Sequence, residues 1–594
     1  MLLYSNDIKS RLFKQGSRLL LCMLFLLLLS HLFYVESRMA YIYYDEIWMS
    51  RWLSCFYIIA ILLLFFKPAT ILVYTFFDGF AVGLFLIILL RSGMWSAASI
   101  ELAQLKNYFL IILLPFFINN LIRNELLGQK AMLVTLIVIS TCTVFFSLYM
   151  YSDSAANSVV GNFRNPNLLS AYLSLLFPVN LFYLLKKKSS VTTISIGLLS
   201  GINSVLIIGI VLLNNSRNAL AAIVITMLCF LFIYLQRKGI RFLRLKNAII
   251  GIGASLVLFT ASNYLYHSKK ASADGRWVIH KITLQGIMDA PIMGHGFNSF
   301  KKLYPLYQEA YLKQKIVSAE LDLIDNTTHA FNEYLQLAFE LGLLVLGGFL
   351  GLIFYFLRSI LKDSTGPYQS LLLSLVLALL FSSFFYNMFH AYELTLMALI
   401  QLSVFIPFKS RPFRQPFMGK PAIAFLLLLL LVFQWQFAEK RARAQFYWWK
   451  ANEEINPGMV MMQYMQRAAN ALSNNPDYLY NLGAMEYKMN RWKESLESLS
   501  RAEANSSHTN LFLYKGNVYR ALQKNDSALL YYQKASGILP HLFIPKNKIM
   551  MLQLRMGDTV VAKQLAAKIK SMKIKIPSQS VTQIKRNADK ILSY

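Results

Sequence analysis

Long apolar runs separated by short polar connections fill most of the chain up to about residue 437. A bilayer core about 30 Å thick requires a helix of about 20 apolar residues. The pattern predicts thirteen spans, near residues 18–35, 52–66, 69–90, 107–122, 128–150, 166–185, 191–213, 218–235, 246–266, 331–357, 368–388, 391–408 and 421–437. We therefore expect an all-α polytopic membrane protein of about 12 to 13 transmembrane helices, in which residues 1–437 form the membrane domain.

Composition and charge support this interpretation. The 594 residues are 56% hydrophobic, which is too apolar for a series of soluble domains. The net charge of +30 comes from basic residues scattered at helix ends, so membrane topology explains it better than nucleic-acid binding. The four cysteines all lie in apolar runs, which argues against a disulfide framework and against a cysteine-ligated metal site.

The distribution of lysine and arginine predicts the orientation. Lys9, Arg11, Lys14 and Arg18 precede the first apolar run and no small-residue cleavage site follows it, so we expect an uncleaved first span with a cytoplasmic N-terminus. The even-numbered connections are then cytoplasmic, and they carry most of the basic clusters. Two long polar segments, 267–330 and 438–594, fall on the opposite side.

The polar tail, residues 438–594, repeats at a period near 34. Gly483 and Leu499 of one unit correspond to Gly516 and Tyr532 of the next, and Pro540 closes the second unit. This period predicts a solenoid of tetratricopeptide-like helix pairs, whose concave surface binds a peptide or a partner protein. A generic helical tail that only solubilises the C-terminus is the alternative.

Two short connections on the outer side carry unusual polar residues. Gly161 to Asn167 contains Arg164 and three asparagines, and its Pro166 can open the sixth span while asparagine side chains satisfy free backbone groups. Asn214 to Ala219 places Arg217 at the membrane surface, where a guanidinium can bind a phosphate with two hydrogen bonds. An interfacial arginine can equally serve as a snorkelling anchor.

The long connection, residues 267–330, carries further candidates. It contains Asp274-Gly275-Arg276-Trp277 and Pro291 to Phe297, and it ends at Thr328-His329-Ala330-Phe331-Asn332 before the tenth span, in which Glu340 is a carboxylate at a span position. We expect His329 at a helix start, where a neutral imidazole can accept a proton from a hydroxyl. A capping role is the alternative. We interpret Glu320, Asp322 and Asp325 as a solvated acidic face, not as a cation site, and His295 as a loop residue.

Taken together, these segments resemble the O-antigen ligase and polymerase superfamily. The resemblance covers roughly residues 160 to 400, and it rests on the order and spacing of the five motifs. It implies a glycosyltransferase of the membrane type, resembling the GT-C class, in the bacterial inner membrane with a periplasmic active site. The implied donor is an undecaprenyl-pyrophosphate-linked glycan, the implied reaction inverts the anomeric carbon, and neither a metal nor a cofactor takes part.

By this resemblance, the essential arginines and histidine of the family correspond to Arg217, Arg276 and His329, and substrate binding involves Arg164, Asn167 and Asn332. Arg164 can substitute for either arginine. The chain departs from the family at one position, because many members carry a histidine immediately before the asparagine of the last motif. Here that residue is Phe331, and His329 lies two residues upstream.

The sequence leaves the identity of the acceptor open. Lipid A core sugar would make the protein an O-antigen ligase of lipopolysaccharide biosynthesis, an exported protein would make it a protein O-oligosaccharyltransferase, and the growing glycan would make it a polymerase. The repeat tail mildly favours a protein acceptor or partner. A non-catalytic scaffold or a transporter of lipid-linked glycan is the alternative from another class.

Overall fold

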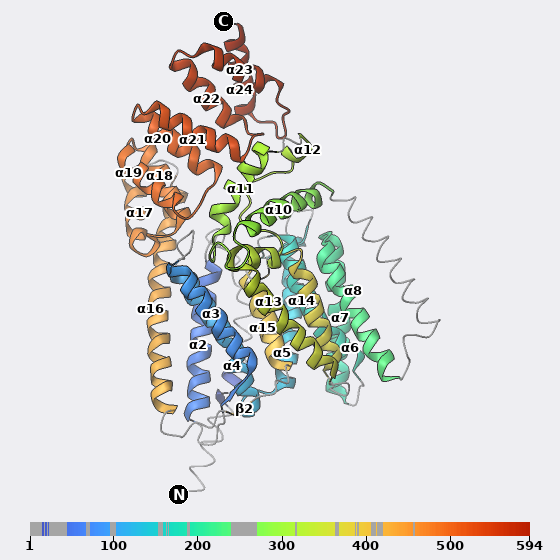
Figure 1. Cartoon of the computed structure of the whole chain (residues 1–594). Helices are drawn as coiled ribbons and strands as arrows, with labels where there is room; N and C mark the ends of the chain where they lie inside the picture. Colours follow the sequence, from blue (N-terminus) through green and yellow to red (C-terminus); the bar gives the residue numbers. More distant parts are fainter. Residues whose placement is uncertain are drawn as a thin grey trace. The chain divides into compact units, whose positions relative to one another are not determined.

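The computed structural model is all-α apart from one short strand pair (Figure 1). It describes residues 15–16, 18–20, 22, 44–66, 72–94, 102–152, 158–161, 163, 165–186, 190–238, 270–314, 318–362, 368–386, 388, 391–405, 411–412, 420–454 and 458–593. The chain divides into two compact units. Unit 1 comprises residues 1–87, 102–263 and 347–443, and unit 2 comprises residues 88–101, 264–346 and 444–594.

Unit 1 contains the apolar helices. They are α2 (Tyr44–Phe66), α3 (Phe76–Met94), α4 (Leu102–Arg123), α5 (Gln129–Ser152), α6 (Pro166–Leu185), α7 (Val191–Leu213), α8 (Arg217–Arg237), α14 (Gln369–Ser383) and α15 (Tyr392–Phe405), with parts of α13 (Glu333–Lys362) and α16 (Lys420–Glu453). A two-residue antiparallel pair joins β1 (Val73–Tyr74) to β2 (Arg411–Pro412). Among the described helices, α5, α6, α7, α8, α13 and residues 422–453 of α16 are long and apolar enough to cross a membrane. The protein is a polytopic all-α membrane protein.

Several helices differ in length from the predicted spans. The first and ninth predicted spans, 18–35 and 246–266, lie outside the described residues except for a few positions of the first. The second helix, α2, begins at Tyr44, well before the predicted residue 52, because its first turns carry Asp45, Glu46 and Arg51, which an apolar window excludes. For the same reason α16 continues past residue 437 through its polar second half.

Polar side chains buried between the helices of unit 1 bond to each other or to the backbone. The amide of Asn180 on α6 donates to Ser140 Oγ on α5 at 3.1 Å, and Asn203 on α7 donates to Thr141 Oγ1 at 2.8 Å and to Asn180 Oδ1 at 3.3 Å. In hydrocarbon, where water cannot serve as a partner, such bonds hold helices together. They connect α5, α6 and α7 into one layer.

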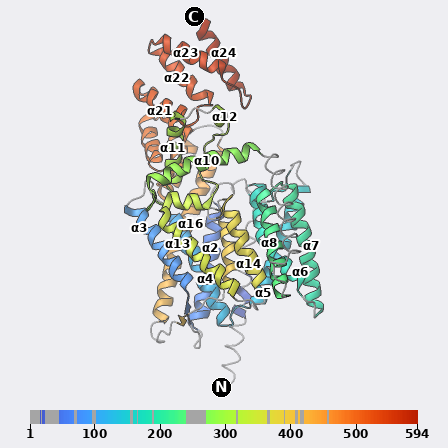
Figure 2. The same cartoon turned by 45° about the vertical axis from the view of Figure 1, so that its right-hand side comes forward.

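Unit 2 combines the long connection with the tail. It contains α10 (Lys270–Asp289), α11 (Phe300–Gln314), α12 (Ser318–Leu321), the first part of α13, and the tail helices α17 (Met459–Leu472), α18 (Pro476–Lys488), α19 (Trp492–Glu503), α20 (Thr509–Ala521), α21 (Asn525–Ile538), α22 (Phe543–Arg555), α23 (Thr559–Ser571) and α24 (Gln579–Ser593). In both cartoon views, consecutive tail helices form hairpins (Figures 1 and 2). Small residues lie where paired helices meet, since a Cβ on Gly483 would come within 2.6 Å of Leu499, and one on Gly516 within 2.5 Å of Tyr532.

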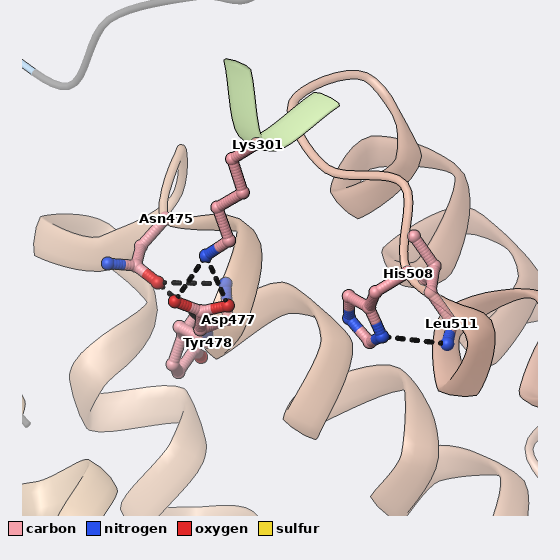
Figure 3. Close-up of polar contacts among 6 residues, drawn as sticks. All are labelled: Lys301, Asn475, Asp477, Tyr478, His508 and Leu511. Atoms are coloured by element: carbon pink, nitrogen blue, oxygen red, sulfur yellow. Dashed lines mark hydrogen bonds and ion pairs between the residues drawn. The ribbon is translucent and has the colours of Figure 1, made fainter. Parts of the chain in front are cut away.

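The long connection packs directly on the tail within unit 2. Helix α11 lies against α21, where Gln308 Nε2 donates to the carbonyl of Ile538 at 2.8 Å. Lys301 Nζ lies 2.8 Å from both carboxylate oxygens of Asp477, at the start of α18 (Figure 3). Side chains of α10, α11 and α13 share one hydrophobic core with α20, α21 and α22. Residues 270–346 and the tail therefore form one body.

Candidate active site

In unit 1, one buried amide joins the two polar connections that the sequence singles out. Asn214 Oδ1 accepts the N–H of Val159 at 2.8 Å, and Asn214 Nδ2 donates to the carbonyl of Val159 at 2.8 Å. The same Nδ2 also contacts the carbonyl of Pro166 and Ser170 Oγ, both at 3.1 Å. The Gly161 to Asn167 connection and the Asn214 to Ala219 connection are thus held side by side.

The start of α6 is capped as predicted. Pro166 is the first helical residue, and Asn165 Oδ1 accepts the N–H of Leu168 at 2.8 Å. The hydroxyl of Tyr386, from the turn after α14, donates to the same Asn165 oxygen at 3.2 Å. Asn167 is half-buried in the first turn of α6. The predicted substrate-binding residue Arg164 lies outside the described residues, as does Asn162.

Arg217 is the first residue of α8, directly after the cap residue Ser216. Its side chain is half-buried, and it follows Asn215, which has a positive φ of 52° and reverses the chain. One residue later, Asn218 Nδ2 contacts the carbonyl of Phe385 at 3.4 Å. Arg217 therefore sits at the end of unit 1 where three connections converge: residues 158–167, residues 214–218 and residues 384–386.

In unit 2, Arg276 and the His329 motif lie next to each other. The guanidinium carbon of Arg276, on α10, lies 5.4 Å from the ring centroid of Phe331, a cation–π distance. Phe331 has a φ of 51°, which is unusual for a bulky residue. The residue that replaces the histidine of many family members is therefore the one on which Arg276 stacks.

The motif ends in a helix cap, which corrects one expectation. Asn332 Oδ1 accepts the N–H groups of Tyr334 at 3.0 Å and Leu335 at 3.1 Å, so the oxygen of this predicted substrate-binding residue caps the helix. Because α13 begins at Glu333, His329 lies in the loop before the cap and not at the helix start. The field of the helix end falls off within its first turn, so it is a weak influence on His329.

The residue between His329 and Phe331 is held from two sides. The N–H of buried Ala330 donates to Gln336 Oε1 at 2.9 Å. The backbone of Ala330 also forms a hydrogen bond with His280, one turn after Arg276 on α10. Burial, together with the nearby charge of Arg276, lowers the pKa of His280, so its imidazole is neutral at pH 7. Sequence reasoning missed His280, although its spacing of four residues from Arg276 on a helix was a signal.

Behind this segment, a glycine-containing loop fills an interruption in α13. Gly342 has a φ of 84°, and the carbonyls that the break leaves free accept N–H groups of the loop: Gly296 donates to Glu340 at 2.8 Å and His295 to Phe339 at 2.9 Å. A Cβ on Gly342 would lie 2.0 Å from the carbonyl oxygen of Ile292, so no other residue fits. This close approach explains why both motifs contain glycine.

Glu340 is the buried carboxylate of this arrangement. Its Oε2 accepts the N–H of Asn298 at 2.8 Å, and its Oε1 accepts Gln336 Nε2 at 3.0 Å. Since Gln336 also binds Ala330, a continuous chain of hydrogen bonds leads from the loop through Glu340 to the residue beside His329. The buried carboxylate of Glu340 is thus satisfied by hydrogen bonds inside the protein.

Among the acidic residues before the His329 motif, Glu320 forms hydrogen bonds within unit 2. Glu320 is half-buried, and it accepts Lys281 Nζ at 2.9 Å and the hydroxyl of Tyr311 at 2.9 Å, so it is not a solvated side chain. His295 packs against Phe339, with 4.7 Å between the ring centroids, and its Nε2 lies 2.8 Å from the carbonyl oxygen of Gly286.

In the described part of the chain, no group of three or more histidine, cysteine or carboxylate side chains is arranged to hold a metal ion.

The segment that carries these features, residues 202–350, matches the family model described as O-antigen ligase. The chain carries an O-antigen ligase family segment. Arg217, Arg276, His329 and Asn332 lie within the match, whereas Arg164 and Asn167 precede it. No curated protein matches the chain. The match of this segment to the family model indicates a membrane glycosyltransferase-like enzyme.

Proposed function

We propose that the protein transfers a glycan from undecaprenyl pyrophosphate to an acceptor on the periplasmic face of the bacterial inner membrane, as an O-antigen ligase does. The main support is that the O-antigen ligase segment contains Arg217, Arg276 and His329. Two of these, Arg276 and His329, lie next to Ala330 and Phe331 in unit 2. Arg276 stacks on the ring of Phe331, and a hydrogen bond to Gln336 holds Ala330 in place. Arg217 belongs to unit 1 and is assigned by the family resemblance alone.

The proposed step is a direct displacement. An acceptor hydroxyl attacks the anomeric carbon, the bond from that carbon to the pyrophosphate oxygen breaks, and the configuration inverts. His329 receives the hydroxyl proton as general base, a role typically worth about 10²–10⁴-fold. Undecaprenyl pyrophosphate leaves with the bonding electron pair, and Arg217 and Arg276 stabilise the charge that develops on it.

In this mechanism two arginines stabilise the charge that develops on the leaving pyrophosphate, so the step requires no metal ion. An arginine also keeps its charge when partly buried, which suits a site at the membrane surface. Phe331 contributes by holding the Arg276 guanidinium over its ring, which restricts the rotamers of the side chain.

Lipid A core is the first acceptor we propose, and an exported protein is the second. The observation that favours a protein acceptor is the shared core of α10, α11 and α13 with α20, α21 and α22. A polypeptide bound to tetratricopeptide-like hairpins would be held by the same body that carries Arg276 and His329. A polymerase acting on the growing glycan is the third possibility.

The test is glycan transfer in membranes that contain purified lipid-linked donor. We expect His329→Ala, Arg217→Ala and Arg276→Ala each to lower transfer by at least about 10²-fold at matched protein levels, since each removes a group that acts in the transition state. Arg586→Ala is the matched control, because Arg586 is an exposed arginine on α24. Full transfer by all three variants would refute the catalytic assignment and leave a scaffold or a transporter.

The acceptor is a separate question. In cells that lack the protein, loss of glycan from lipopolysaccharide with unchanged protein glycans would identify lipid A core as the acceptor. Loss of glycan from exported proteins would identify a protein O-oligosaccharyltransferase, and shortened glycans on an otherwise normal acceptor would identify a polymerase.

A further inference from the structure

Helix α10 exposes an apolar face that its own fold does not cover. Trp277, Leu284 and Met288 are exposed and, at 3.6 residues per turn, lie on the same side of the helix. The other sides of the helix, with Val278, Ile282 and Ile287, are buried in the core of unit 2. A soluble helix would carry polar residues on the exposed side, so this pattern needs an apolar partner.

The exposed face continues beyond the end of α10. Ile292 and Met293, in the turn that follows, are also exposed. The neighbouring Pro291 accepts the N–H of Leu343 at 2.8 Å, which fixes this turn beside α13. Leu343 and Leu344 are exposed on α13, a helix long and apolar enough to cross a membrane. The face of α10 is therefore continuous with the exposed apolar surface of a helix that is long and apolar enough to cross a membrane.

The polar residues along this face fit the boundary between lipid and water. Lys281 lies on the same side, between Trp277 and Leu284, and is paired with Glu320 at 2.9 Å. A tryptophan at one end, and a lysine whose apolar stem lies along the stripe while its amine is held in an ion pair at the edge, are typical of residues at a membrane surface. The face thus combines an apolar stripe with groups that favour headgroups.

We propose that α10 is an interfacial helix that lies along the bilayer surface, with Leu284, Met288, Ile292 and Met293 among the outer ends of the phospholipid acyl chains. This placement holds Arg276, on the flank of the same helix, at the depth of the lipid phosphates. The proposal does not depend on the glycosyltransferase assignment, since a scaffold with the same helix would lie on the membrane in the same way.

The test is a depth measurement on the full-length protein in phospholipid vesicles. A nitroxide is attached to Met288→Cys, or in a second preparation to Leu284→Cys, in a background whose four native cysteines are replaced by alanine. Val560→Cys on the tail is the matched control, because Met288 is 69% exposed and Val560 is 66% exposed. Accessibility to oxygen and to a water-soluble nickel chelate gives the depth of each label.

We expect both α10 labels about 5–10 Å below the headgroup boundary, and the Val560 label in water. An aqueous signal from the α10 labels equal to that of Val560 would overturn the proposal. An apolar signal that forms only after undecaprenyl phosphate is added would also overturn it, because the face would then bind the polyprenyl chain. So would a signal that weakens as the ratio of protein to lipid falls, which would indicate a second copy.

Discussion

The two connections that carry Arg217 and Arg276 are stabilised in different ways. In unit 1, the single side chain of Asn214 binds the backbone of residues 159 and 166 and so holds two connections at once. In unit 2, a relay of hydrogen bonds through Asn298, Glu340, Gln336 and Ala330 connects the loop to the segment beside His329. One side chain is enough to fix two tight turns between spans, whereas a long connection needs several linked contacts to hold its backbone in place.

This difference predicts how each region responds to substitution. In unit 1, removal of the single side chain of Asn214 should cause an abrupt loss of stability. In unit 2, removal of one member of the relay should lower the stability by an amount that depends on how much backbone that member supports.

The glycine at the break of α13, beside the relay, should be the most sensitive position of unit 2. Gly342→Ala would place a Cβ 2.0 Å from the carbonyl oxygen of Ile292 at a φ of 84°, so the loop of residues 291–296 must separate from the helix. We expect little folded protein by size-exclusion chromatography after detergent extraction. Gly347→Ala is the control, since nothing lies within 4 Å of its added Cβ. Normal folding of Gly342→Ala would show that the break is not required.

Removal of the central amide of unit 1 should come next. Asn214→Ala leaves the buried N–H and carbonyl of Val159 without their side-chain partner, at a cost of about 1–3 kcal/mol for each group. We expect a clear fall in the melting temperature of the purified protein. Asn218→Ala, which loses only a 3.4 Å contact, should melt close to the unsubstituted chain. Equal melting temperatures for the two variants would contradict the central role of Asn214.

Acidification should weaken unit 2 through the tail that supports its loop. His508 Nδ1 accepts the N–H of Leu511 at 3.2 Å as the cap of α20 (Figure 3), and burial lowers its pKa from 6.5 to about 4. Because the unfolded chain then binds the proton more readily, stability is full above about pH 6.5 and declines toward pH 4, by about 2 kcal/mol at pH 5.

The measurement is hydrogen exchange of α20 as a function of pH. His508→Asn keeps a side-chain oxygen that can cap the helix but does not titrate, so its exchange should lack the acid-dependent increase beyond the intrinsic rate. An increase of the same size in the variant would assign the effect to another group.

The smallest effect concerns His280, which we expect to position the residues beside it. His280→Phe removes the hydrogen bond to Ala330, and we expect transfer to fall about two- to tenfold through kcat, with KM for the donor unchanged. His280→Asn, whose amide can donate in place of the imidazole, should restore most of the rate. In the His329→Ala background, His280→Phe should cause no further loss, because the two act as a unit. A full additional loss would indicate an independent role.

The membrane class, the position of most helices and the O-antigen ligase resemblance could be predicted from the sequence. These features depend on apolar length, helix capping and the spacing of motifs, which are local properties. The cap at Pro166 and Asn165 was predictable for this reason, because each residue acts on the helix that it begins.

The neighbours of the candidate residues, in contrast, are visible only in the folded chain. The stacking of Arg276 on Phe331, the support of Ala330 by His280 and Gln336, and the shared core of loop and tail all join residues that are distant in the chain or on different elements. The prediction that His329 lies at a helix start was wrong, because the cap side chain of Asn332, and not the hydropathy pattern, sets where α13 begins. Packing selects such contacts among many that the same local preferences allow, and a single sequence does not reveal that selection.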